Sequence, residues 1–134
     1  MRGPDDADRK KLVDTIEAYF LSVTSKRSLE IQIDPYYDAP ACLCNSSLQS
    51  FIETALQSHD LPVFYLPSGA GHDAMAMADL CPVAMLYVRC KDGISHNPAE
   101  YCSVEDMDCA ISVLIQTVQA MALKNHIETN KESK

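Results

Sequence analysis

The amino-acid sequence predicts an α/β fold, and three observations support that prediction. Segments of helical periodicity alternate with short strand-like segments, in the order helix, strand, helix, strand, helix, strand, helix. One strand-like run, residues 83–88, is apolar throughout, as expected of a strand that is covered on both faces. Two glycine-containing bends, one before and one after that run, each carry a histidine, which is how such a fold delivers polar side chains to one edge of a sheet.

The N-terminal third predicts one helix followed by one strand. Apolar residues recur at helical spacing from Asp5 to about Val23, and aspartates cluster in the first turn, where the helix dipole favours negative charge. Residues 29–34 alternate apolar and polar side chains, which is typical of a half-buried strand. Pro35 ends this strand, and a loop is expected to follow it.

The middle of the chain predicts a second helix, a strand and a short third helix. Asn45 or Ser46 can cap the second helix, because both residue types are favoured at helix N-termini. Residues 61–66 form a short strand-like run, residues 67–71 form a bend, and a short helix is expected over residues 72–80.

The last predicted helix begins at the cap pair Ser103-x-x-Asp106. Its apolar residues recur at alternating steps of three and four: Val104, Met107, Ile111, Leu114, Val118 and Met121. The polar segment 125–134 is expected to be a disordered tail.

Composition restricts the class of protein. The chain has 134 residues, 47% of them hydrophobic, and a formal net charge of −8, so one domain's worth of core is available. An acidic chain is a poor ligand for nucleic acid or an anionic membrane surface, which both need clustered Lys and Arg. No apolar run is long enough to cross a bilayer, and the N-terminal residues lack the apolar region of a signal peptide. We therefore expect a cytoplasmic protein without nucleic-acid or membrane partners.

The chain contains six cysteines, at positions 42, 44, 81, 90, 102 and 109. We expect them to be reduced and structural, because the chain has ample aliphatic core and no secretory signal. A zinc site built from four of them is an alternative, although their spacing lacks the C-x-x-C pattern of such sites.

The two histidines of the bends are the candidates for chemistry. His96 follows a predicted buried strand, where α/β sheets place ligands, and neutral imidazole is a common zinc ligand. Glu100 is a candidate partner for His96. His72 follows a glycine-rich bend and opens a predicted helix, whose free N–H groups favour an anion. On the residues alone, a loop histidine bonded to backbone and an ordinary turn remain open alternatives.

The segments SGAGHDAM (residues 68–75) and DGISHNPAE (residues 92–100) together resemble a known enzyme family. They are similar to the C-terminal part of metal-dependent amidohydrolases of the hydantoinase/carbamoylase type, which include allantoate amidohydrolases, ureidoglycolate amidohydrolases and N-carbamoyl-amino-acid hydrolases. The resemblance runs from about Arg2 to Ala122.

This resemblance implies a division of the chain into parts of a larger fold. Residues 1–34 would be the last helix and strand of a ferredoxin-like lid and dimerisation domain. Residues 35–124 would be the C-terminal part of a di-metal, aminopeptidase-like α/β/α catalytic domain. Residues 125–134 would be the tail.

The resemblance also implies roles for five residues. His96 would bind one metal of a two-metal centre. His72, with Gly71 and Ala70, would line the substrate pocket near the reacting carbonyl. Arg2 would bind the substrate carboxylate, for which a guanidinium fork is suited. No residue of this chain is assigned as catalytic, because the family's general base and remaining metal ligands belong to other motifs.

The implied function is hydrolysis of a C–N bond in a linear ureido or carbamoyl acid by a metal-activated water, a type of step found in purine catabolism. The implied cofactor is a divalent metal, zinc or manganese, and the intact enzyme would be a homodimer. One histidine cannot hold a metal, so the chain alone is expected to be inactive. Two alternatives stay open: a non-catalytic binding or interaction remnant of the fold, and a related aminoacylase or dipeptidase.

Overall fold

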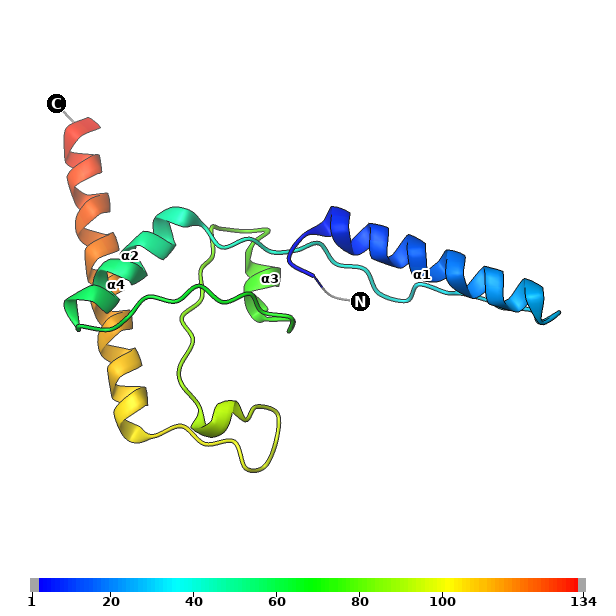
Figure 1. Cartoon of the computed structure of the whole chain (residues 1–134). Helices are drawn as coiled ribbons and strands as arrows, with labels where there is room; N and C mark the ends of the chain where they lie inside the picture. The colour runs from blue at the N-terminus through cyan, green and yellow to red at the C-terminus, as the bar shows by residue number, and fades with distance from the viewer. Residues whose placement is uncertain (1–2, 133–134) are drawn as a thin grey trace. The chain divides into compact units, whose positions relative to one another are not determined.

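The structure is a computed structural model that describes residues 3–132, with side chains to residue 124. Its described elements are helical: α1 (Asp6–Lys26), α2 (Ser46–Ser58), α3 (Asp73–Met77), the 3-10 helix η1 (Lys91–Gly93) and α4 (Val104–Glu132) (Figure 1). The chain divides into two compact units. The first comprises Met1–Leu43 and Leu66–Ala76, and the second comprises Cys44–Tyr65 and Met77–Lys134.

Helix α1 of the first unit begins where the sequence predicts it. The Asp5 carboxylate accepts a hydrogen bond from the Asp8 backbone N–H at 2.8 Å, which satisfies one of the free donors of the first turn. The helix ends at Lys26, where a positive charge is favoured by the helix dipole. The predicted helix is therefore confirmed, and it is about one turn longer than its apolar pattern suggested.

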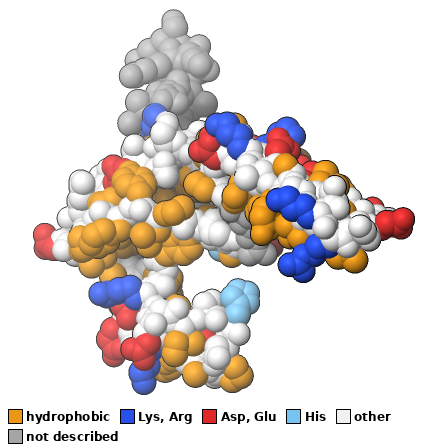
Figure 2. Space-filling model, turned by 45° about the vertical axis from the view of Figure 1, so that its right-hand side comes forward, with side chains coloured by type: hydrophobic (Ala, Val, Ile, Leu, Met, Phe, Trp, Pro, Cys, Tyr) orange, Lys and Arg blue, Asp and Glu red, His pale blue; other side chains and the backbone are white. Residues whose placement is uncertain are grey.

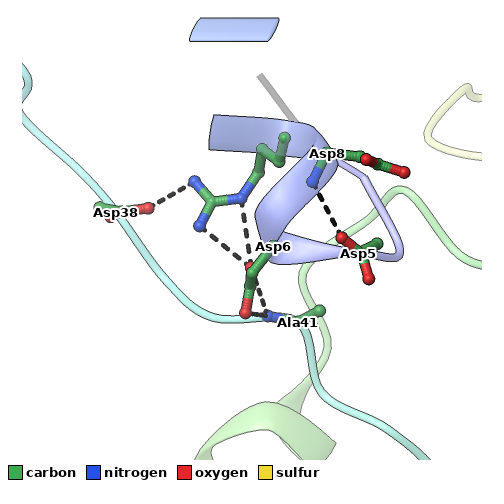
Figure 3. Close-up of polar contacts among 6 residues, drawn as sticks. Asp5, Asp6, Asp8, Asp38 and Ala41 are labelled. Atoms are coloured by element: carbon green, nitrogen blue, oxygen red, sulfur yellow. Dashed lines mark hydrogen bonds and ion pairs between the residues drawn. The ribbon is translucent and has the colours of Figure 1, made fainter. Parts of the chain in front are cut away.

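An ion-pair cluster connects the start of α1 to the extended segment that follows the helix (Figure 3). The Arg9 guanidinium forms ion pairs with Asp6, at 3.1 Å, and with Asp38. The Asp6 carboxylate also accepts the Ala41 backbone N–H, with both oxygens 3.1 Å from the nitrogen. These bonds hold residues 38–41 beside the first turn of α1.

The core of the second unit lies where α2 packs against α4. Within the described residues the buried apolar side chains are Ala55 of α2 and Val113 of α4, exposed by 2% and 1%. Thr117 is buried one turn after Val113, and its hydroxyl donates to the Val113 carbonyl at 2.8 Å. At the edge of this contact the Ser58 hydroxyl donates to the Gln116 side-chain oxygen at 2.8 Å. The pair of helices is thus held by a small apolar contact.

Both long helices of the second unit have the N-terminal caps that the sequence predicts. The Asn45 side chain accepts the Leu48 N–H at 3.1 Å. The Ser103 hydroxyl accepts the Asp106 N–H at 3.0 Å and donates to the Asp106 carboxylate at 2.8 Å. Helix α4 continues to Glu132, into the segment for which the sequence predicts a disordered tail; that prediction stays a prediction.

The structure corrects the prediction of strands. Residues 29–34, 61–66 and 83–88 belong to no strand in the part of the chain that the structure describes, and its α/β character is therefore not seen there. A strand needs a neighbouring backbone for its N–H and C=O groups. The segment 83–88 has one backbone bond of this kind, from Asn45 N to the Val83 oxygen at 2.8 Å, which is not a ladder.

Most of the periodic apolar residues of α4 are exposed. Val104, Ile111 and Val118 are exposed by 68%, 56% and 56%. The helix turns Val113 and Thr117 toward α2 instead. Exposed hydrophobic side chains, drawn in orange, are visible on the face of the molecule that Figure 2 shows.

Candidate functional site

The bend before α3 positions His72 through a local hydrogen-bond pair. The Ser68 hydroxyl lies 2.7 Å from Nε2 of His72 and accepts the Ala70 backbone N–H at 3.1 Å. A serine hydroxyl carries one donor and two acceptor positions, so it can bond Ala70 and either tautomer of His72 at once. The pair therefore holds the imidazole ring at the bend. Ser68 was not among the predicted site residues, although its position four residues before His72 was a local signal.

The glycines of the bend stand in open space. A Cβ added at Gly69 or Gly71 would meet no atom within 4 Å. The packing of this chain therefore does not require glycine at Gly71, and neither glycine has a positive φ. Glycine at these positions leaves the backbone of the bend accessible to a small molecule.

The helix α3 that follows His72 is short. It has five residues, Asp73–Met77, where the sequence predicts a helix over residues 72–80. The Met75 N–H bonds to the His72 carbonyl at 2.9 Å, and Asp73 lies in the first turn. His72 therefore marks the start of this helix, as predicted.

His96 lies at the tip of a loop of the second unit, which we call the histidine loop, residues 91–101. His96 is exposed and has a φ of 55°, a left-handed conformation that is unusual for a residue other than glycine. Its backbone N–H donates to the Glu100 carboxylate at 2.9 Å. The Glu100 carboxylate therefore bonds the backbone of His96. The sequence instead suggested that Glu100 supports the His96 side chain as a metal ligand.

The two ends of the histidine loop are bonded to each other. The Lys91 N–H donates to the Tyr101 carbonyl at 2.8 Å, so the chain returns to its starting point after η1 (Figure 1). Asp92 and Gly93 both have positive φ, 56° and 67°, which makes the sharp turn at the start of the loop. His96 therefore lies in a loop whose two ends are hydrogen-bonded to each other.

A charged cluster joins the segment before the histidine loop to the start of α4. The Asp106 carboxylate accepts from the Ser103 hydroxyl and forms an ion pair with Arg89. The hydrogen bond from Ser103, and then the Arg89 charge, lower the pKa of Asp106 below its ordinary value of 3.8. Burial, followed by the charges of Asp106 and Cys90, raises the pKa of the Cys102 thiol.

The described residues do not by themselves fit a metal ion. Among them, no group of three or more His, Cys, Asp or Glu side chains could hold a metal ion. His72 belongs to the first unit and His96 to the second, so each is described separately and their convergence on one site stays a prediction. All six cysteines are free thiols. Arg2, the predicted carboxylate ligand, lies outside the described residues.

None of the helices, as far as the structure describes them, is long and apolar enough to cross a membrane.

Comparison with known proteins identifies relatives over most of the chain. The allantoate deiminase of Arabidopsis thaliana is 36% identical over 130 residues, which cover 90% of this chain and 24% of that protein. The N-carbamoyl-L-amino acid amidohydrolase of Geobacillus stearothermophilus is 34% identical over 101 residues, which cover 75% of this chain and 25% of that protein. The ureidoglycolate hydrolase of rice is 26% identical, with 92% of this chain and 26% of that protein covered.

The chain spans about a quarter of the length of the curated relatives that it matches. The profile of Peptidase family M20/M25/M40 matches residues 3–120, a range that includes both the bend with His72 and the histidine loop. The chain belongs to this peptidase family.

Proposed function

We propose that this protein is an amidohydrolase that cleaves a C–N bond of a linear ureido or carbamoyl acid. The supporting observation is that both histidine-bearing segments lie within the matched residues 3–120. The names of the relatives point the same way, since they include an allantoate deiminase and an N-carbamoyl-L-amino acid amidohydrolase. Because this chain corresponds to about a quarter of those proteins, the activity is proposed for the whole protein, with this chain supplying part of its site.

We assign the substrate side of this site to the bend before α3. The Ser68 hydroxyl fixes the ring of His72, and a Nδ1–H tautomer can donate a hydrogen bond to a carbonyl or carboxylate oxygen. The backbone of Ala70 and Gly71 would contact the substrate directly, because glycine has no side chain and that of alanine is a single methyl group. Arg2 would bind the substrate carboxylate, and residues 1–34 would belong to the lid domain.

We assign one metal ligand to His96. A divalent metal, zinc or manganese, would supply electrophilic activation of the amide carbonyl when bound in the whole protein. The contribution of this chain is one imidazole on a loop whose conformation is fixed by Glu100. The remainder of the proposal follows the family resemblance: residues 35–124 would be part of the catalytic domain, and the intact protein would be a cytoplasmic homodimer.

The metal assignment can be tested with a variant that keeps the left-handed backbone conformation of His96. Asparagine tolerates a left-handed φ, whereas alanine adds strain, so His96→Asn removes the imidazole with the least disturbance of the loop. His59→Asn is the matched control, because His59 is also exposed and lies in the same unit. In the whole protein, zinc and manganese affinity should fall by at least roughly 10- to 100-fold in His96→Asn, since loss of a mere partner of a ligand already costs that much, and should remain unchanged in His59→Asn. Equal affinity in both variants would contradict the assignment.

A non-catalytic role is the second candidate, and it is favoured by the absence of a three-donor cluster among the described residues. Ammonia release from allantoate and from N-carbamoyl amino acids separates the two candidates. Release that depends on added metal and is lost in His96→Asn supports the hydrolase. A folded protein that binds these acids without releasing ammonia supports a binding remnant.

A further inference from the structure

The histidine loop has a cysteine at each of its two ends. Cys90 immediately precedes the loop and Cys102 immediately follows it. Both side chains are half-buried, and both are free thiols. The remaining question is whether their backbones lie close enough for a bond.

The hydrogen bond at the neck of the loop limits the distance between them. The Lys91 backbone N–H donates to the Tyr101 carbonyl at 2.8 Å. Cys90 directly precedes Lys91, and Cys102 directly follows Tyr101. Covalent geometry therefore keeps the two cysteine Cα atoms within roughly 8 Å of each other. A disulfide requires Cα atoms about 4.4–6.8 Å apart, which lies within this limit.

A second observation supports this proximity. After burial and the Asp106 charge, the Cys90 charge is a further cause that raises the pKa of the Cys102 thiol, which agrees with the short path between them through the neck of the loop. Neither thiol is engaged by a strong partner: Cys90 Sγ lies 3.8 Å from the Val88 carbonyl oxygen, and Cys102 Sγ lies 3.6 Å from that of Ser103. Both contacts are weak S–H donations that a disulfide can replace.

We propose that Cys90 and Cys102 form a reversible disulfide that closes the histidine loop at its neck. The oxidant is a low-molecular-weight disulfide, such as oxidised glutathione. The Cys90 thiolate attacks one sulfur of the oxidant, and one glutathione thiolate leaves. The Cys102 thiolate then attacks the Cys90 sulfur of the mixed disulfide, and the second glutathione thiolate leaves. The two protons lost by the cysteines protonate the two departing thiolates.

The order of attack follows from the surroundings of the second thiol. Burial and the Asp106 carboxylate disfavour the Cys102 thiolate, so Cys102 is the poorer first nucleophile. In the mixed disulfide it is held beside its target and reacts intramolecularly. The resulting ring contains His96, and it restricts the loop that holds this side chain. This inference does not rest on the proposed metal or substrate, because it concerns the loop alone.

The experiment is oxidation of the whole chain with oxidised glutathione, followed by blocking of free thiols and mass spectrometry without reduction. Cleavage after Arg89, Lys91, Glu100 and Glu105 isolates each partner, because residues 90–91 and 101–105 then contain one cysteine each. The cross-linked product should join these two peptides. Its yield in native buffer should exceed that in urea by roughly tenfold, because folding raises the effective concentration of one thiol at the other.

Two variants control for alternative pairings. Cys102→Ser should abolish the product. Cys109→Ser is the matched control, because Cys109 is also half-buried and lies nearby in the sequence on α4, and it should leave the yield unchanged. A yield no higher in native buffer than in urea, or a native product that joins other cysteines, overturns the pairing.

A second measurement tests the closure of the loop. Amide hydrogen exchange of residues 92–100 should slow upon oxidation of the wild-type chain and should recover upon reduction. The same treatment of Cys102→Ser should leave exchange unchanged. A disulfide that forms without slowing exchange would overturn the proposed restriction of His96.

Discussion

The contact between α2 and α4 makes a quantitative prediction for Val113. This side chain is 1% exposed and is the largest fully buried one among the described residues. Replacing it with alanine removes two carbon atoms, worth about 0.8 kcal/mol each in transfer free energy. The cavity left behind adds to this cost, and the better helix propensity of alanine offsets about 0.5 kcal/mol. Val113→Ala should therefore lower the free energy of unfolding by about 2 kcal/mol.

Val118→Ala is the matched control on the same helix. Val118 is 56% exposed, so the same substitution there removes little buried surface and gains the same helix propensity. Urea unfolding, followed by circular dichroism at 222 nm, measures both variants against wild type. Equal losses in the two variants, or a larger loss in Val118→Ala, would show that the buried face of α4 has been identified incorrectly.

Three further predictions concern the first turn of α1, the cap of α4 and the bend before α3. Arg9→Lys should speed amide exchange at Ala41, because a lysine cannot bridge two carboxylates as the guanidinium does; unchanged exchange would show that the cluster in Figure 3 does not hold this segment. The lowered pKa of Asp106 means that its ionised form stabilises the fold above about pH 3.8 and that this stabilisation is lost as pH falls through the folded-state pKa. Asp106→Asn should therefore flatten the fall in urea midpoint between pH 5 and pH 2.5, and an equally steep fall would contradict this. Gly71→Ala should leave the free energy of unfolding in urea within about 0.5 kcal/mol of wild type while weakening binding of a carbamoyl acid, and intact binding would argue against a substrate role.

Helix starts could be predicted from the sequence because caps are local. Asp5, Asn45 and Ser103 each bond to an N–H three residues later, so the residues that make the bond lie within one turn of the chain. The contact between Ser68 and His72 is equally local, and attention to the serine hydroxyl would have found it. The two histidine-bearing motifs were also visible in the sequence, and the family match includes both of them.

The strands predicted at residues 29–34, 61–66 and 83–88 are not present in the part of the chain that the structure describes. Alternation in residues 29–34 and the apolar run at 83–88 indicate a preference for extended backbone, and they do not supply the neighbouring strand that would bond to it. The buried face of α4 was hidden for a related reason. Its apolar stripe is wider than one partner helix can cover, and only the position of α2 selects Val113 and Thr117 as the buried residues.

By itself the sequence determined where the helices begin, which two histidines are candidates for chemistry, and which family the chain resembles, because these depend on residue types at short spacing. Tertiary structure alone decided which side of α4 is buried, how Arg9 connects α1 to residues 38–41, and that the two ends of the histidine loop are hydrogen-bonded to each other. Each of these joins residues that are distant along the chain. Such contacts depend on the tertiary path of the backbone, which local residue patterns do not specify.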